Sequence, residues 1–144
     1  MVEPDTIRLL RECDAGIRMG VSSIEEVLDR VADTAFRKRL TTCMSAHESL
    51  KSEIQSLLDR YGDDGKAPNP VAKGMAHVKT GVKLSMDDSD QMIASLMTDG
   101  CNMGVKSLSQ YLNQYKAADE VSKDIAKRLI ALEAQLSVDI REFL

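Results

Sequence analysis

The sequence has no tryptophan and few aromatic residues, prolines or histidines: Trp 0, Phe 2, Tyr 3, Pro 3 and His 2 in 144 residues. Because strands favour aromatic residues, this composition argues against an all-β chain, and we expect helices to dominate. The few scattered aromatics also provide no platform on which nucleic-acid bases could stack. A net charge of −4 further opposes phosphate binding, so we expect no nucleic-acid partner.

Long apolar runs are absent as well. Without an uncharged apolar stretch of about 18 residues, no segment is expected to cross a membrane. The first dozen residues, MVEPDTIRLLRE, carry acids and arginines, so we expect no export signal. The three cysteines, Cys13, Cys43 and Cys101, lack CxxC spacing, which favours reduced thiols in a cytoplasmic protein over a disulfide or zinc framework.

One segment of the chain occurs twice. The sequence GIRMGVSSIEEVL at 16–28 returns as GCNMGVKSLSQYL at 100–112, 84 residues later. Each copy opens a long amphipathic pattern, and each is followed by a second such pattern, so the repeat organises the whole chain. We therefore expect a single domain, 1–144, built from two copies of an antiparallel helix hairpin.

Apolar residues at steps of three and four predict four helices. The first pattern begins with Asp5 as its cap and continues to Val31, and the second extends from Phe36 to Leu57 before a stop at Gly62. Each contains one polar member, Asp14 in the first and His47 in the second. The third pattern follows the acidic run 87–90 and repeats the seam of the first from Gln91 onward, and the fourth covers 125–143 with no polar member.

The two halves are joined by a connection too long for a hairpin loop. Residues 61–86 start with a cluster of turn formers and continue with apolar residues at steps of three and four from Val71 to Met86. We expect a short amphipathic helix there. The short links within each half and the long one between them predict an all-α four-helix bundle of two antiparallel hairpins joined by a crossover.

Four helical glycines call for an explanation, because glycine within a helix costs about 1 kcal/mol relative to alanine. Gly16 with Gly20, and Gly100 with Gly104, are spaced by four and so share one face of each helix. A close approach of a neighbouring backbone would compensate for that cost. We favour packing within the chain as the source of this approach, with a homodimer interface as the alternative.

Three segments carry a resemblance to a known superfamily: LLRECDAG at 9–16, SAHESLKSEIQSLL at 45–58 and LMTDGCNMG at 96–104. With the order of the helices, they resemble the ferritin-like superfamily, in particular a bacterial branch of short two-hairpin domains of unknown function. The resemblance covers nearly the whole chain and implies a ferritin-like four-helix bundle.

Metal-binding members of that superfamily imply a dinuclear site with a glutamate on each of two helices and ExxH on each of the other two. Here Met44 replaces the glutamate of the motif that ends at His47, and no histidine follows Glu133 at the matching position. At the corresponding position of the first and third helices, the first has Asp14 and the third has Thr98. We therefore expect an incomplete di-metal site with His47, Asp14 and Glu133 as remnant ligands.

Asp14 and His47 lie about 7 Å apart in height when counted from the turn between their helices. They could form a remnant or mononuclear metal site, or a buried polar pair that fixes helix register, and we favour the second interpretation. No enzyme motif is present, so we expect action by binding or assembly, without catalytic residues or a cofactor. The alternative is a divergent iron or manganese oxidoreductase or an iron-storage relative.

Overall fold

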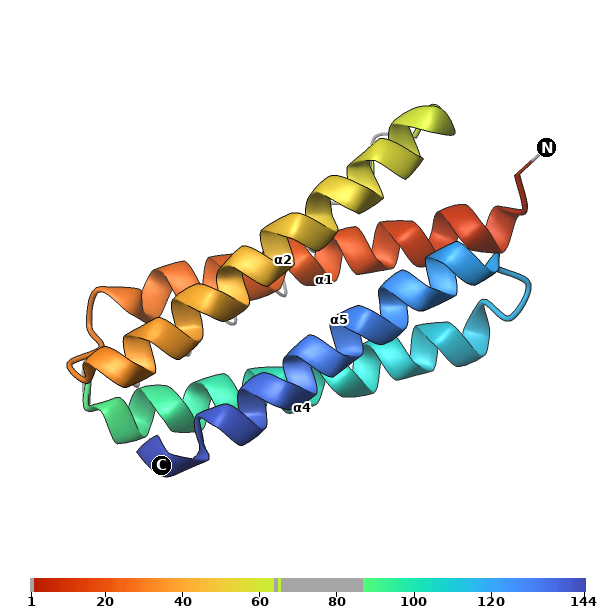
Figure 1. The fold of residues 1–144 in the computed structure, drawn as a ribbon. Coiled ribbons are helices and arrows are strands. Elements are labelled where there is room, and N and C mark those ends of the chain that lie inside the picture. The colour runs from red at the N-terminus through yellow and green to blue at the C-terminus, as the bar shows by residue number, and fades with distance from the viewer. Residues whose placement is uncertain (1, 64, 66–86) are drawn as a thin grey trace.

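The computed structural model describes residues 2–63, 65 and 87–144, and these residues form helices and no strands (Figure 1). The α-helices are α1 (Pro4–Leu28), α2 (Thr34–Arg60), α4 (Asp90–Gln114) and α5 (Glu120–Asp139), and a short 3₁₀ helix follows at Arg141–Phe143. The prediction of four long helices is thus confirmed. The predicted short helix at 71–86 lies outside the described residues. None of the described helices is long and apolar enough to cross a membrane.

The beginnings of three helices are fixed by side-chain caps. Asp33, Ser89 and Asp119 precede α2, α4 and α5, and each side chain accepts a hydrogen bond from the backbone N–H three residues later. α1 differs from the prediction. It begins at Pro4, whose fixed φ suits the first helical position, and so Asp5 lies inside the first turn instead of capping the helix.

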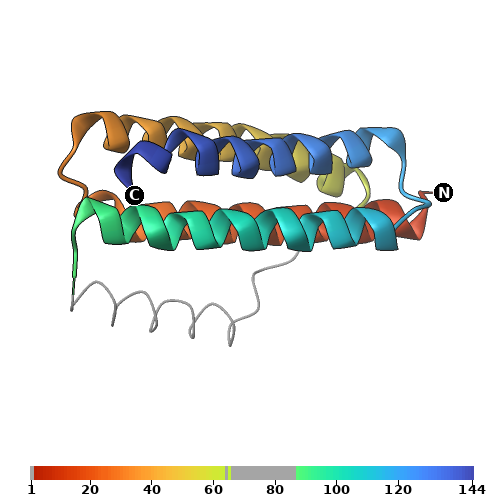
Figure 2. The same ribbon diagram turned by 90° about the horizontal axis from the view of Figure 1, so that it is seen from below.

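The helices form two layers, α1 with α4 and α2 with α5 (Figure 2). α1 packs against α2 and α4 against α5, which are the two sequential hairpins. Contacts between α1 and α4, α2 and α5, and α1 and α5 join the hairpins to each other. Each helix therefore has at least two neighbours across which to bury its apolar face.

The buried positions of two helices differ from the seam that the sequence pattern predicts. Leu58 is buried while Leu57 is only partly so, and Gln91, expected to face inward, is exposed while Ile93 and Met97 are buried. A helix that contacts two or three neighbours buries a broad stripe, and the residues at its centre are set by the packing of all the neighbours. The sequence pattern alone located the stripe but not its centre.

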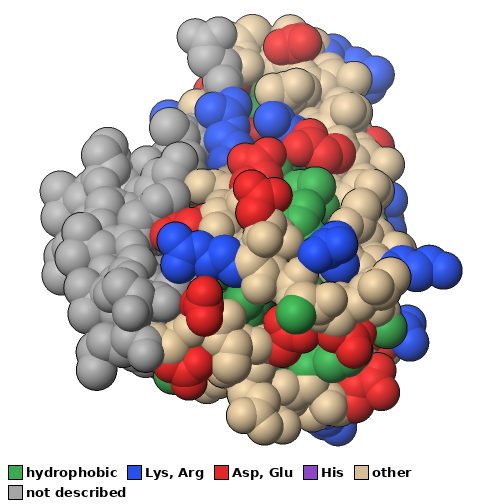
Figure 3. Space-filling model, turned by 90° about the vertical axis from the view of Figure 1, so that its left-hand side faces the viewer, with side chains coloured by type: hydrophobic (Ala, Val, Ile, Leu, Met, Phe, Trp, Pro, Cys, Tyr) green, Lys and Arg blue, Asp and Glu red, His purple; other side chains and the backbone are tan. Residues whose placement is uncertain are grey.

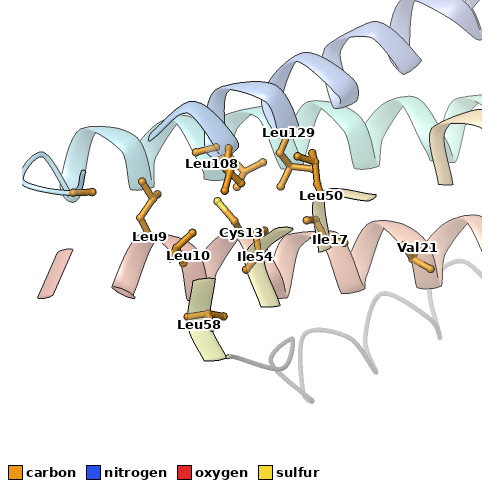
Figure 4. Packing of buried hydrophobic residues seen from close by; sticks show 13 residues of the cluster. Leu9, Leu10, Cys13, Ile17, Val21, Leu50, Ile54, Leu58, Leu108 and Leu129 are labelled. Carbon is orange, nitrogen blue, oxygen red and sulfur yellow. The ribbon is translucent and has the colours of Figure 1, made fainter. Parts of the chain in front are cut away.

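The core consists of two apolar clusters that follow one another along the bundle. The first is centred on leucines and isoleucines of all four helices, including Leu9, Ile17, Leu50 and Leu129 (Figure 4). The second lies toward the α1–α2 loop and contains Phe36, whose ring stacks on Phe143 of the 3₁₀ helix with centroids 4.6 Å apart.

Two sets of hydrogen bonds tie each hairpin to the loop of the other, and we call them the inter-hairpin clasps. At one end, the Asp90 carboxylate accepts from the backbone N–H groups of Ala32 and Asp33, both at 2.9 Å. At the other end, the Thr6 hydroxyl oxygen accepts from the backbone N–H of Asp119 at 2.8 Å. The start of α4 thereby holds Asp33, the N-cap residue of α2. In the same way the start of α1 holds Asp119, the N-cap residue of α5.

Candidate functional site: a buried histidine–glutamate pair

The centre of the bundle holds a polar contact between α2 and α5. Nε2 of His47 lies 2.8 Å from Oε1 of Glu133, and the two side chains are 1% and 12% exposed. His47 stands between Cys43 of one apolar cluster and Leu50 of the other, and Glu133 stands between Leu129 and Leu136 in the same way. The His47–Glu133 pair, hereafter the central pair, therefore separates the two clusters.

Both ring nitrogens of His47 have partners. Nδ1 lies 2.8 Å from the backbone carbonyl oxygen of Cys43, one helical turn earlier, and 3.5 Å from the Cys43 sulfur. With Nδ1 donating to that carbonyl and Nε2 donating to the Glu133 carboxylate, the protonated imidazole satisfies both of its N–H groups. The ring orientation is thus fixed from two sides.

The protonation of His47 follows from these contacts. Burial by itself lowers the pKa of His47, but the hydrogen bonds that the ring makes to Cys43 and Glu133 and the negative charge of Glu133 outweigh it and raise the pKa from 6.5 to about 10. At neutral pH the central pair is therefore an imidazolium and a carboxylate joined by a charge-assisted hydrogen bond.

Two of the four repeat glycines make room for the central pair. A Cβ atom at Gly20 would lie 3.1 Å from Nε2 of His47 and 3.4 Å from Oε1 of Glu133. A Cβ atom at Gly104 would lie 3.4 Å from the Glu133 carboxyl group. These glycines thus approach a polar side-chain pair, whereas the sequence had suggested a close approach of backbones.

The other two glycines have different surroundings. A Cβ atom at Gly16 would make ordinary contacts of 3.8 and 3.9 Å with Leu108 and Leu129. Gly100 is exposed, and among the described residues a Cβ atom there would have no neighbour within 4 Å. Close packing within the described part of the chain therefore does not account for Gly100.

Asp14 lies away from the central pair and does not form the buried polar pair with His47 that the sequence favoured. Its carboxylate is buried and forms an ion pair with Arg18, whose Nη2 is 3.1 Å away. It faces Gly65, where a Cβ atom would lie 2.6 Å from Oδ2 of Asp14. Asp14 precedes Gly20 by six residues, about 240° around the helix, so the two positions face different neighbours. Similar heights along the two helices therefore do not bring Asp14 and His47 together.

The residues of the expected metal site do not converge. Of the three predicted ligands, the structure brings His47 and Glu133 together and places Asp14 elsewhere. Thr98 is half-buried, and its hydroxyl donates to the carbonyl oxygen of Ala94 at 2.8 Å. Over the described ranges, no group of three or more His, Cys, Asp or Glu side chains is arranged to hold a metal ion. These residues do not fit the dinuclear centre that the resemblance implies.

A direct hydrogen bond between His47 and Glu133 was not predicted, although both residues were expected in one site. The two residues are 86 positions apart. The cap residues Asp33 and Asp119 of the same two helices have the same separation. Aligning α2 with α5 by their caps therefore makes His47 and Glu133 equivalent positions of the two helices.

The three cysteines have distinct environments. Burial raises the pKa of the Cys13 thiol to about 12, with smaller contributions from Glu12 and Asp14. Burial, followed by the charge of Glu133, also raises the pKa of Cys101. Cys43, next to His47, lines a surface groove between α2 and α5.

Charges on the surface are mixed. On the end of the molecule seen in Figure 3, acidic and basic side chains alternate with small apolar areas, and neither sign dominates. This face offers no extended basic surface of the kind that nucleic acids require.

Comparisons of the chain with protein-family models, with curated proteins and with solved structures found no match.

Proposed function

We propose that this chain is a ferritin-like bundle of two duplicated hairpins that acts by binding or assembly and not by dinuclear metal catalysis. The central pair carries this proposal. The metal-binding proteins that the sequence resembles place their metal ligands in the middle of the bundle, where His47 and Glu133 here bind each other.

Duplication is supported by equivalent features in the two halves. Asp33 and Asp119 cap equivalent helices, and the inter-hairpin clasps join equivalent elements at opposite ends. Gly20 and its repeat counterpart Gly104 both adjoin the central pair. The burial patterns agree too, since each buried position of α2 from Phe36 to Leu50, apart from His47, has a buried counterpart 86 residues later.

The chemistry of the central pair favours a structural role. Iron and manganese sites need several oxygen and imidazole ligands that converge on one point. The imidazole of His47 is engaged at both nitrogens, and Gly20 of α1 and Gly104 of α4, which adjoin the pair, bring no side-chain ligand atom. One carboxylate and one engaged imidazole are too few for a dinuclear centre.

A buried charge pair can instead fix the register of helices. Sliding α2 against α5 by one turn would leave an imidazolium and a carboxylate in apolar surroundings without partners, at a cost of several kcal/mol, on the order of 3–5. The pair thus selects one alignment of the two apolar clusters. Gly16, Gly20 and Gly104 all face atoms of their own chain, which supports packing within the chain over a homodimer through these three residues.

Metal content tests the proposal. The purified protein, incubated with Fe²⁺, Mn²⁺ or Zn²⁺ and desalted, should retain well below one metal per chain by elemental analysis. His47→Gln should lower the free energy of unfolding without changing this content, and Glu48→Gln, at the neighbouring exposed position, should change neither. Two metals per chain that are lost in His47→Gln would overturn the proposal in favour of an oxidoreductase or iron-storage relative.

A further inference from the structure

A groove lies between the N-terminal half of α2 and the C-terminal half of α5. Its lining includes Lys38, Arg39 and Cys43 from α2, and Leu132, Leu136 and Asp139 from α5. Its volume of about 370 Å³ is at the lower end of the range for small-molecule pockets. The groove thus gives a small ligand access to a cysteine that packs against the central pair.

The groups behind Cys43 form a thiol–imidazole–carboxylate series. The Cys43 sulfur lies 3.5 Å from Nδ1 of His47, and Nε2 of the same ring lies 2.8 Å from Glu133. A nucleophilic thiol is activated when an imidazole held by a third group adjoins it, because the reacting form is the thiolate. A thiolate formed at Cys43 would have the imidazolium beside it, held in place by Glu133.

The two other cysteines provide an internal contrast. Cys13 and Cys101 are 0% and 2% exposed and do not line the groove, whereas Cys43 is 7% exposed and does. Burial and nearby acids raise the pKa values of Cys13 and Cys101. Both features oppose reaction of these two thiols in the folded protein.

Charges in the groove favour an anionic ligand. Among the described lining residues, Lys38 and Arg39 contribute two cations and Asp139 contributes an acid, which accepts a hydrogen bond from Gln135 at 2.8 Å. The apolar side chains of Leu132 and Leu136 suit the body of a small molecule. An anionic molecule with an apolar portion therefore matches this lining.

We propose that Cys43 is a nucleophilic thiol that reacts with small disulfides bearing carboxylates, bound in the groove between α2 and α5. The Cys43 sulfur forms a bond to one sulfur of the disulfide, and the original S–S bond breaks. The other half departs as a thiolate, which takes up a proton equivalent to the one lost from Cys43. The product is a mixed disulfide on the protein. This reaction does not depend on the proposed absence of a metal centre.

Labelling of the folded protein tests the assignment. Treatment with 5,5′-dithiobis(2-nitrobenzoate) should release about one equivalent of thionitrobenzoate per chain in a fast phase. Peptide mass mapping without reductant should place the label on Cys43, with Cys13 and Cys101 labelled at least about tenfold more slowly until denaturant is added. The mapping uses the natural sequence, so it does not depend on the folding of a variant. Labelling of Cys43 no faster than of the other two would overturn the proposal.

Two variants test the surroundings of Cys43, each with its folding checked by circular dichroism. Lys38→Gln/Arg39→Gln should slow the anionic reagent several-fold and leave the rate with neutral 2,2′-dithiodipyridine unchanged, while Lys51→Gln, further along α2, should change neither rate. Equal rates with the anionic reagent in the wild type and the double variant would overturn the preference for anions. In a folded His47→Gln variant the neutral reagent should also react more slowly, and an unchanged rate would remove the part assigned to His47.

Discussion

Alanine substitutions at the repeat glycines should have opposite effects on stability, depending on how close each lies to the central pair. Gly100→Ala introduces a methyl group where the described structure has no neighbour within 4 Å. Gly20→Ala introduces one 3.1 Å from Nε2 and 3.2 Å from Cδ2 of His47. Both distances from the new methyl group at position 20 are shorter than an ordinary van der Waals contact, so the imidazole of His47 must move.

The magnitudes follow from helix propensity and from the hydrogen bond to Glu133. Replacement of a helical glycine by alanine stabilises a helix by about 1 kcal/mol, which should be the effect of Gly100→Ala. At Gly20 the same gain is opposed by disruption of a charge-assisted hydrogen bond worth about 1.5–3 kcal/mol. We therefore expect Gly20→Ala to destabilise by about 1 kcal/mol. The two variants should differ by about 2 kcal/mol, or roughly 6 °C in melting temperature.

Urea denaturation followed by circular dichroism measures both changes, provided that the slope with denaturant stays constant. A double-mutant cycle isolates the cause, because Gly20→Ala should become stabilising in a His47→Ala background, where the ring is absent. If Gly20→Ala stabilised the natural protein as much as Gly100→Ala does, the close contact between Gly20 and the central pair would be wrong. The same conclusion would follow if the effect of Gly20→Ala were identical in both backgrounds.

Two further predictions concern the central pair and the inter-hairpin clasps. The pKa of His47 is raised to about 10 in the folded state, so its stabilising effect is complete below about pH 6.5 and is lost as the pH rises through about 10. The free energy of unfolding should therefore fall by a few kcal/mol, on the order of 4, between about pH 6 and about pH 10 in the wild type and much less in His47→Gln. Parallel curves for the two proteins would contradict the assignment. Asp90→Ala removes the acceptor of two backbone N–H groups and should lower the free energy of unfolding, measured with urea, by about 1–2 kcal/mol. The control Asp88→Ala, at a neighbouring exposed position, should have little effect. Equal losses in the two variants would argue against the clasp.

The sequence was sufficient to predict the helices because each helix is specified locally. The three-and-four spacing gave the four amphipathic segments, and Gly62, with φ of +70°, lies just after the end of α2 as expected of a C-terminal glycine. The polar positions Asp14 and His47 were also correctly placed among the buried residues. These features depend on neighbours within about one helical turn.

The partners of the buried polar residues could not be predicted in this way. The apolar pattern at 125–143 has no polar member, yet Glu133 of α5 reaches His47 while its apolar neighbour Leu132 is only partly buried. The rotation of α5 about its axis depends on contacts with both α2 and α4, and helical periodicity within α5 does not contain that information. Asp14 likewise faces Gly65, which follows α2, so its surroundings depend on the path of the chain beyond the helix.

The central pair has a consequence for how a bundle of this kind could arise. Under the proposed duplication, His47 and Glu133 are the same position in two copies of one ancestral hairpin. In a symmetric dimer of that hairpin, a residue on the two-fold axis meets its own copy, so a glutamate would face a glutamate and a protonated histidine would face another. Like charges held this close repel each other. Once the two copies can differ in sequence, as they can within one chain, the position can change independently in each half and give opposite charges. An attractive contact between equivalent positions is therefore an asymmetry that a dimer of identical hairpins could not have.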